Sequence, residues 1–335
     1  MNIKLSICIP TLNRGKFIGE TLDSIISQAG NDVEIVVVDG GSKDGTEDVI
    51  KSCQAKFENL RYYRPAESDL TQNSVAPSNK GYDQDCNRAI ELAKGEYCWI
   101  LPDDDVLMPN AIRAVLDQLE NGYSLILVNS ELRNAKLSQV ITNKRLPIDR
   151  NAVYPDLESF FEKSIQYVSY AGAVVIERNL WLVRNRSDYF GTAFVHVGVI
   201  FQAALPSPAL IIAEPFISVR YSNAHWTSRA FEIGMVTYPT LIGSFVYISQ
   251  AARNKYTSLS PISGLVTMAI YRAKKQYSLV EYRKFKHLSF SCAFCRFITL
   301  IIAIIPPDYI RVPALNLAKI FKKEKQILIY DLENS

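Results

Sequence analysis

An α/β fold built around a mostly parallel sheet is predicted by the first hundred residues, where short apolar runs alternate with amphipathic ones. Residues 5–10 and 33–38 are apolar runs of strand length, and each is followed by a polar loop and then by apolar residues at helical spacing. A third apolar run, Tyr97 to Leu101, is bounded by Gly95 and Pro102. Repeated strand–loop–helix units favour parallel strands buried between helices.

Polar residues follow the first two predicted strands directly. The first strand ends in the loop 11–14, and a helix is predicted over residues 16–28. The second strand ends in Asp39, and the glycine-rich turn 40–46 leads into a helix from about Glu47. Ligands of parallel sheets bind outside the carboxyl ends of the strands, so we expect these polar groups to meet at one edge.

Three consecutive carboxylates, Asp103, Asp104 and Asp105, follow the third predicted strand. Adjacent carboxylates repel one another unless a cation lies between them. Hard oxygen ligands suit Mg²⁺ or Mn²⁺, which bind substrate phosphates together with protein carboxylates. The alternative is an acidic turn that caps a helix beginning near Pro109. The first interpretation predicts a divalent-metal site at the edge where Asp39 also emerges.

Together these motifs resemble those of glycosyltransferase family 2, whose catalytic domains have the nucleotide-binding GT-A fold. The matching segments keep the family's order and spacing between residues 3 and 108; they are Ser6–Arg14, Val37–Thr46, Asn87 with Ala93–Tyr97, and the three aspartates. The resemblance implies a GT-A, Rossmann-like, mostly parallel central sheet flanked by helices. It also implies a nucleotide-diphosphate sugar donor, with Mn²⁺ or Mg²⁺ bridging its diphosphate to the acidic cluster.

The resemblance also implies roles for single residues. It assigns the principal metal contact to Asp104, with Asp105 next, and the base and ribose contacts to Thr11 and Asp39. The donor site that it predicts also includes Pro10, Asn13, Arg14, Gly41, Ser42 and Asp103.

Elementary chemistry supports a ligand-binding role for Asp39, and the turn after it departs from the family pattern. A carboxylate at a strand end can accept hydrogen bonds from a base or ribose, and a glycine-rich turn allows close approach of main-chain amides. The alternative is an ordinary strand-to-helix connection with Asp44 as a local cap. The family often has a second Asp at Gly40 and a small or acidic residue at Pro102, so its Asp-x-Asp pattern is shifted here.

A long polar connection runs from Glu67 to Arg88 and ends in a helix. Such connections in compact domains are often functional, and we expect Asp83 and Arg88 to contact the donor. The segment is similar to one in family members that build bacterial surface polysaccharides. The alternative is that Asp83 and Asp85 are favourable charges at a helix N-terminus.

A general base is expected in the segment from Asp188 to Gly198, because inverting transfer needs a group that deprotonates the acceptor hydroxyl. His196 lies near the position of the family's acidic residue, and Asp188 lies upstream of it. We therefore predict these two as catalytic candidates. The alternative for His196, which stands between Val195 and Val197, is a packed core residue.

The segment Val219–Arg229 resembles the Arg- and His-containing segment that follows the last strand of the family's catalytic domain. His225 is predicted to join the metal or the diphosphate, and Arg229 to neutralise the leaving group. Trp226 is a candidate for stacking on a sugar, or else buries apolar area.

Composition favours one large domain, residues 1–230, followed by a helical, basic and apolar extension, residues 231–335. The whole chain has a net charge of +3, but residues 270–335 hold twelve Lys or Arg against five Asp or Glu. The apolar run 297–305 is shorter than the roughly 20 residues that span a bilayer. Its basic flanks, Arg283, Lys284, Lys286 and Arg296, suggest attachment to an anionic membrane surface. Burial against the domain or in a dimer is the alternative.

Other features narrow the expected function. The six cysteines lack metal-ligand spacing, no signal peptide is evident at the N-terminus, and no basic–aromatic array indicates a nucleic-acid partner. We therefore expect a cytoplasmic enzyme on the inner face of the membrane that transfers a sugar to a lipid-linked O-antigen or capsule glycan.

The donor sugar and two rival functions remain open at this point. Gly95–Ile100 and Gly191–His196 are similar to abequosyltransferase-like members, which suggests a deoxy- or dideoxyhexose. The alternatives are a nucleotidyltransferase, although the loop after residue 10 lacks its Gly-rich basic signature, and a non-catalytic membrane scaffold.

Overall fold

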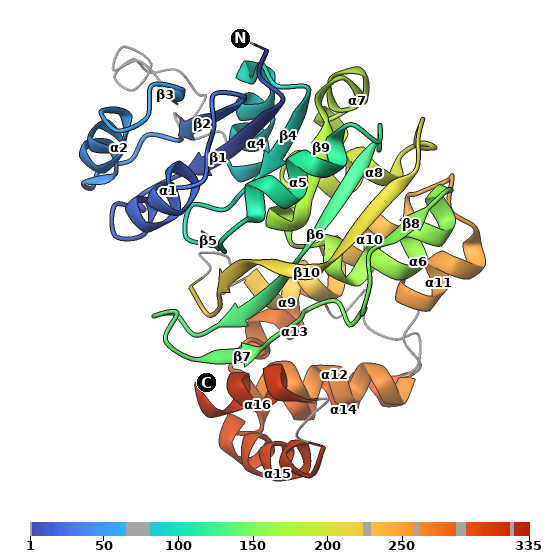
Figure 1. The fold of residues 1–335 in the computed structure, drawn as a ribbon. Helices are drawn as coiled ribbons and strands as arrows, with labels where there is room; N and C mark the ends of the chain where they lie inside the picture. The colour runs from blue at the N-terminus through green and yellow to red at the C-terminus, as the bar shows by residue number, and fades with distance from the viewer. Residues whose placement is uncertain (1, 65–80, 224–228, 258–260, 286–292, 322–324) are drawn as a thin grey trace, which may run out of the picture. The chain divides into compact units, whose positions relative to one another are not determined.

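The computed structural model describes residues 2–64, 81–223, 229–257, 261–285, 293–321 and 325–335 (Figure 1). The chain divides into two compact units. The N-terminal unit comprises Met1–Tyr221 and Val246–Ile248, and the C-terminal unit comprises Ser222–Phe245 and Ser249–Ser335.

The predicted α/β fold is confirmed, and its sheet is mixed. The path of hydrogen-bonded strands through the described residues is β3-β2-β1-β4-β9-β6-β10-β5, while β7 pairs with β6 and β8 with β10. The strands are β1 (Leu5–Thr11), β2 (Val33–Asp39), β3 (Leu60–Tyr63), β4 (Tyr97–Ile100), β5 (Val106–Leu107), β6 (Leu125–Arg133), β7 (Val140–Thr142), β8 (Ala152–Tyr154), β9 (Val174–Glu177) and β10 (Ala209–Arg220). The half β3-β2-β1-β4 is parallel, as is the pair β6 and β10, but β9 runs antiparallel between β4 and β6.

Strand register explains why polar residues meet at one edge. Thr11 pairs with Asp39 at the ends of β1 and β2, and Cys8 pairs with Ile100 in β4. Thr11 and Asp103 each follow three residues after the pair Cys8 and Ile100, so both lie at the same end of the parallel strands β1 and β4. All residues of β1 and β2 are buried, so the period-2 alternation of a half-exposed strand is absent.

Helices cover the sheet of the N-terminal unit. They are α1 (Ile18–Ile26), α2 (Thr46–Gln54), α4 (Tyr82–Leu92), α5 (Ala111–Leu119), α6 (Leu157–Val168), α7 (Arg178–Val183) and α8 (Val195–Phe201), with short 3₁₀ turns at Ala171–Ala173 and Ser187–Tyr189. Helix α1 packs against α2, and α4 packs against β1 and β2 (Figure 1). The two largest fully buried side chains, Trp99 and Trp181, each donate a hydrogen bond, to Gly172 O at 2.8 Å and to Asn87 Oδ1 at 3.0 Å.

A buried carboxylate, that of Glu34, joins three neighbouring strands of this sheet. Glu34 of β2 is 3% exposed and accepts hydrogen bonds from Ser6 Oγ at 2.6 Å and from the Lys94 amide at 2.5 Å. Its second oxygen pairs with Arg61 of β3 at 2.5 Å. A buried charge is tolerated only with such partners, so Glu34 ties β1, β2 and β3 together.

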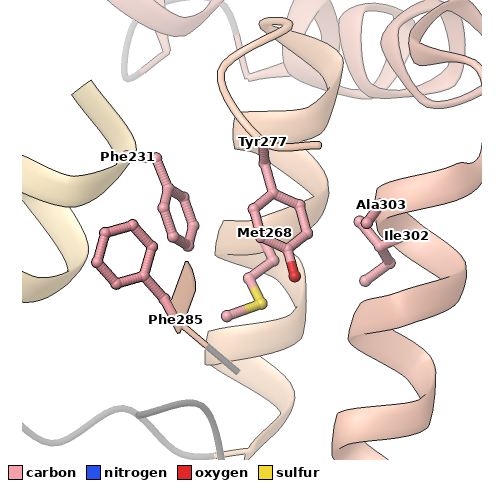
Figure 2. Close-up of a cluster of buried hydrophobic side chains, with 6 residues drawn as sticks. All are labelled: Phe231, Met268, Tyr277, Phe285, Ile302 and Ala303. Carbon is pink, nitrogen blue, oxygen red and sulfur yellow. The ribbon is translucent and has the colours of Figure 1, made fainter. Parts of the chain in front are cut away.

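The described part of the C-terminal unit is helical, which confirms the predicted helical extension. Its elements are α9 (Ala230–Glu232), a π-helical turn (Ile233–Thr237), α10 (Tyr238–Gly243), α11 (Gln250–Thr257), α12 (Pro261–Ala273), α13 (Leu279–Phe285), α14 (Ala293–Ile304), α15 (Pro307–Ile320) and α16 (Gln326–Glu333). The unit has its own small core, shown in Figure 2 and formed by Phe231, Met268, Tyr277, Phe285, Ile302 and Ala303. The rings of Phe231 and Tyr277 lie 4.7 Å apart.

Helices α14 and α15 leave large apolar side chains exposed. On α14 these are Phe294, Phe297, Ile301 and Ile304, which share one face because they recur at spacings of three and four. No single helix in the described ranges is long and apolar enough to span a membrane. Helices α14 and α15 together would be long and apolar enough, although they are bent by 99° at their junction.

Candidate active site

The loops after β1 and β2 are joined to each other by hydrogen bonds. The Asn13 amide donates to Ser42 Oγ at 2.8 Å, and the Lys43 amide donates back to Asn13 Oδ1 at 2.8 Å. The Arg14 amide donates to Thr46 Oγ1 at 2.8 Å. Asn13 has a φ of 54°, a left-handed conformation that Asn tolerates better than most residues. The two predicted donor-binding loops therefore form one rigid surface.

Asp39 organises the second of these loops from within. It is fully buried, and its Oδ1 accepts from the Gly41 amide at 2.9 Å and the Ser42 amide at 2.7 Å, while Oδ2 accepts from the Tyr62 hydroxyl at 2.7 Å. Gly41 has a φ of 99°, which favours glycine. Pro10 and Thr11 are buried at the end of β1, and Thr11 O accepts from the Gly40 amide at 2.9 Å. Asp39 thus shapes the turn that the sequence assigns to the nucleotide.

Arg14 brings the first loop to the acidic cluster. Its Nε lies 3.3 Å from Asp103 Oδ1, and its Nη2 lies 3.6 Å from Asp104 Oδ2. Both acidic side chains are buried, with 12% of each exposed. The structure therefore collects three of the predicted site residues at one point, where one guanidinium faces two neighbouring carboxylates.

Asp105 points into a different set of partners. It is 2% exposed, its Oδ1 accepts from the Arg220 amide at 2.8 Å, and its Oδ2 accepts from the Tyr170 hydroxyl at 2.6 Å. The Arg220 guanidinium in turn donates to Asp104 O at 2.9 Å and to Glu20 Oε2 at 2.5 Å. Neither Tyr170 nor Arg220 was predicted as a site residue. Arg220 lies near the start of the segment Val219–Arg229, which resembles a functional segment of the family, whereas Tyr170 follows a helix with no local sign of its role.

Burial and the neighbouring Asp104 charge raise the pKa of two carboxyls, those of Asp103 and Asp105. Burial and the Asp104 charge raise the pKa of Asp103 to about 7, against the opposing effects of Arg14, Thr11 and the Leu12 amide. Burial and the same charge raise the pKa of Asp105 to about 8, although Tyr170, the Arg220 amide and Arg145 oppose the rise. A divalent cation would favour the ionised forms.

The residues at this edge fit a Mg²⁺ or Mn²⁺ ion. Buried carboxylate oxygens are the hard ligands that these ions prefer. Within the described ranges, no group of three or more His, Cys, Asp or Glu side chains could hold a metal by itself. Mg²⁺ is usually bound through one or two carboxylates, with water and substrate phosphate in its other positions.

Asp83 and Arg88, predicted to contact the donor, face other partners. Asp83 is 4% exposed; its Oδ2 accepts from the Ala193 amide at 2.8 Å and its Oδ1 from the Val195 amide at 3.1 Å. It therefore holds the loop before α8 against the start of α4. Arg88 is exposed on α4, where its Nη1 lies 3.5 Å from Glu91 Oε2.

The two predicted bases differ sharply in environment. His196 is 1% exposed, and one of its ring nitrogens, Nε2, lies 3.0 Å from Val168 O. Burial lowers its pKa to about 4, so the ring is neutral near pH 7. Asp188 is exposed in a 3₁₀ turn and accepts a hydrogen bond from Asn185 Nδ2 at 2.7 Å. The structure does not bring these two side chains into contact with each other.

The last predicted group lies after the sheet. His225 and Trp226 are outside the described residues. Arg229 belongs to the C-terminal unit, where its side chain is 54% exposed and its Nε lies 3.6 Å from Glu232 Oε2.

Comparisons with known proteins agree with this fold. The model of glycosyl transferase family 2 matches residues 6–180, more than half of the chain. The chain is 26% identical over 261 residues to the abequosyltransferase RfbV of Salmonella typhimurium, covering 72% of this chain and 75% of that protein. It is also 26% identical over 323 residues to the GalNAc(5)-diNAcBac-PP-undecaprenol beta-1,3-glucosyltransferase of Campylobacter jejuni, covering 92% and 95%.

Solved structures share the fold across almost the whole chain. TarS 1-349 of S. aureus in complex with UDP-GlcNAc superposes with a TM-score of 0.59 at 16% identity, covering 99% of this chain and 91% of that one. The mannosyltransferase PcManGT of Pyrobaculum calidifontis, solved with GDP-Man and Mn²⁺, gives a TM-score of 0.53 at 15% identity, covering 92% and 88%. The family model and these likenesses lead to one conclusion: the chain belongs to glycosyltransferase family 2 and is a glycosyltransferase.

Proposed function

We propose that this enzyme is a metal-dependent, inverting glycosyltransferase that moves a sugar from a nucleotide-diphosphate donor to a hydroxyl of a lipid-linked bacterial surface glycan. The proposal rests on one observation above all: Arg14, Asp103 and Asp104 meet at the sheet edge where the Asp39 turn also lies. A cation site beside a ligand-binding turn is what transfer from a nucleotide-diphosphate sugar requires.

Asp104 and Asp105 are the residues proposed to hold Mn²⁺ or Mg²⁺, with Asp103 beside them. The Tyr170 hydroxyl and the Arg220 amide fix the Asp105 carboxylate, as hydrogen-bond donors commonly orient metal-binding carboxylates. When bound, the ion would neutralise charge on the leaving diphosphate. Arg14, beside both neighbouring carboxylates, would hold the diphosphate from the protein side.

The base is proposed to be Asp188, because a base must reach the acceptor hydroxyl. Asp188 is exposed, whereas His196 is buried and neutral. Asp83 holds the loop that follows Asp188, because its carboxylate accepts hydrogen bonds from the Ala193 and Val195 amides. Asp188→Asn should abolish transfer but preserve donor binding, and unchanged transfer by this variant would remove Asp188 from the mechanism.

The proposed donor sugar is a deoxy- or dideoxyhexose, and the proposed acceptor carries a lipid diphosphate. Support for the donor comes from the similarity to an abequosyltransferase. Support for the acceptor comes from the similarity, over 92% of this chain, to an enzyme named for a diphosphate-undecaprenol glycan. With this donor and this acceptor, the proposed role of the enzyme is the assembly of an O-antigen or a capsule.

The C-terminal unit is proposed to lie on the anionic inner face of the cytoplasmic membrane. Phe294 and Phe297 are 68% and 59% exposed on the apolar face of α14, and the neighbouring α15 exposes Tyr309 and Ile320. The region 270–335 carries a charge of +7, which suits anionic lipids. An apolar helix face with basic surroundings is typical of helices that lie in the membrane interface.

Flotation with liposomes tests this attachment. The full-length protein should float with vesicles that contain phosphatidylglycerol, and Phe294→Ser with Phe297→Ser should abolish most of that binding. The matched control is Val153→Ser, which changes an apolar side chain 50% exposed in the N-terminal unit. Equal flotation of the double variant and the control would refute the proposed face.

A thermal-shift panel tests the proposed activity. Nucleotide-diphosphate sugars should raise the melting temperature only with Mn²⁺ or Mg²⁺, because binding to the folded state stabilises it. Stabilisation by nucleoside triphosphates instead would favour a nucleotidyltransferase. No response to any nucleotide would favour a non-catalytic scaffold, and in both cases the proposed function would be withdrawn.

A further inference from the structure

Arg145 lies in the connection between β7 and β8, where the sequence predicts no functional residue. Its main-chain amide donates to Ser130 O at 2.8 Å, which fixes the backbone. Its guanidinium carbon lies 5.2 Å from the centre of the Tyr167 ring and 5.0 Å from that of Tyr170. The side chain is half-buried, and among the described residues its guanidinium contacts these two rings but has no hydrogen-bond acceptor and no ion pair.

The two rings form a rigid support. The Tyr167 hydroxyl donates to Val128 O at 2.5 Å, and the Tyr170 hydroxyl donates to Asp105 Oδ2 at 2.6 Å. Gly172 makes room for the second ring, because a Cβ there would lie 2.2 Å from the Tyr170 hydroxyl. Aromatic faces attract a guanidinium and leave the N–H groups along its edge available. The Arg145 guanidinium is therefore held in place without using its hydrogen-bond donors.

Other buried guanidiniums of the N-terminal unit behave differently. Arg184 donates to four main-chain carbonyls, and Arg220 donates to Ala135 O, Asp104 O and Glu20. Arg61 is bonded to Glu34, Tyr63 and Leu92 O. Removing such a group from water is costly unless its donors are satisfied. The half-buried Arg145 lacks those partners, and Tyr170 links it to the acidic cluster, so its donors are available to a ligand.

We propose that Arg145 binds a phosphoryl group of a substrate at the active site. A planar guanidinium matches phosphate oxygens through two parallel hydrogen bonds, and its stacked position is set before the ligand arrives. This inference depends on the proposed function, which supplies two diphosphates of the same chemistry: that of the nucleotide donor and that of the lipid-linked acceptor. Kinetics with each substrate varied in turn distinguish the two sources.

Binding of inorganic pyrophosphate, measured by calorimetry with and without Mn²⁺, is the direct test. Arg145→Ala should weaken binding by about tenfold, and Arg145→Lys, which keeps the charge but loses the planar donors, by about threefold. The matched control is Arg113→Ala, which removes an exposed arginine paired with Asp117 on α5 and should bind like the wild type. Should the alanine variant unfold, the lysine variant provides the comparison.

Steady-state rates identify the source. A KM for the nucleotide sugar that rises about tenfold in Arg145→Ala supports the donor diphosphate. A similar rise confined to the lipid-linked acceptor supports the acceptor diphosphate. Wild-type pyrophosphate affinity together with two unchanged KM values would overturn the inference and leave the proposed function standing. If the wild-type protein itself binds neither pyrophosphate nor any nucleoside diphosphate, the proposed function fails as well.

Discussion

The two units differ in how many of their large apolar side chains are exposed to solvent. The larger N-terminal unit exposes six large apolar residues among those described, and its strands β1 and β2 are wholly buried. The C-terminal unit, half the size, exposes fourteen such residues within its described ranges, most of them on α12, α14 and α15. Contiguous exposed apolar surface marks contact with another molecule or a membrane.

The two units also differ in the number of buried carboxylates that are held by hydrogen bonds. In the N-terminal unit, Glu34, Asp39, Asp83 and Asp105 are buried and each accepts at least two hydrogen bonds. The core of the C-terminal unit, shown in Figure 2, is instead mainly apolar and aromatic. Catalysis requires side chains that are held in a fixed position by such hydrogen bonds. We therefore expect substitutions in the N-terminal unit to affect catalysis, and substitutions in the C-terminal unit to affect membrane attachment.

The largest effect should follow from Asp104→Asn. Loss of the proposed metal carboxylate should lower kcat/KM by about 10³-fold, since electrostatic stabilisation of the leaving group is lost. Mn²⁺ binding, followed by electron paramagnetic resonance, should weaken in parallel. Asp117→Asn, on the surface of α5, is the control. Wild-type activity in Asp104→Asn would separate the acidic cluster from catalysis.

Glu34→Ala should produce the largest loss of stability. It leaves Arg61 without its buried partner and the Lys94 amide without an acceptor, which should cost about 3 kcal/mol in urea unfolding. Glu120→Ala removes an exposed carboxylate paired with Lys4 and should cost less than about 1 kcal/mol. Equal losses would mean that the Glu34 network does not hold the strands together.

His196 should make the N-terminal unit sensitive to acid. Its folded pKa of about 4 lies below the unfolded value of about 6.5, so the unfolded state takes up a proton first as the pH falls. Stability should therefore decline below pH 6.5, by about 2 kcal/mol between pH 7.5 and 5. His196→Gln should lack this part of the decline while the acid limb of kcat/KM stays the same; a shifted limb would restore His196 as a catalytic candidate.

The smallest effect should come from Phe297→Ser. Phe297 is 59% exposed on α14, so its loss should change unfolding by no more than about 0.5 kcal/mol. Ile302→Ala on the same helix, in the core of Figure 2, should cost at least about 2 kcal/mol. A large loss in Phe297→Ser would mean that the α14 face is part of a packed interior.

The first half of the sheet could be predicted because its signals are local. The apolar runs 5–10, 33–38 and 97–101 became β1, β2 and β4, and the polar residues after them lie at one edge. Strand β9 could not be predicted, because it pairs with β4 across about 80 residues and periodicity carries no partner information.

The candidate site shows the same division. Arg14, Asp103 and Asp104 follow strands that share an edge, so sequence order alone suggested their meeting. Tyr170 reaches Asp105 through tertiary packing, and Arg145 lies over the Tyr170 ring, with no motif around either residue. The partners of Asp83 could not be predicted from its place in the first turn of a helix, since its hydrogen bonds go to Ala193 and Val195, more than 100 residues away.

The reciprocal bonds between Asn13 and the Ser42–Lys43 segment have a practical consequence for engineering. Each loop supplies groups that define the other's backbone, so neither has an independent shape. Grafting one loop from a relative with a different donor would leave mismatched partners behind. Donor preference in this enzyme would have to be transplanted with both loops together, as a single cassette.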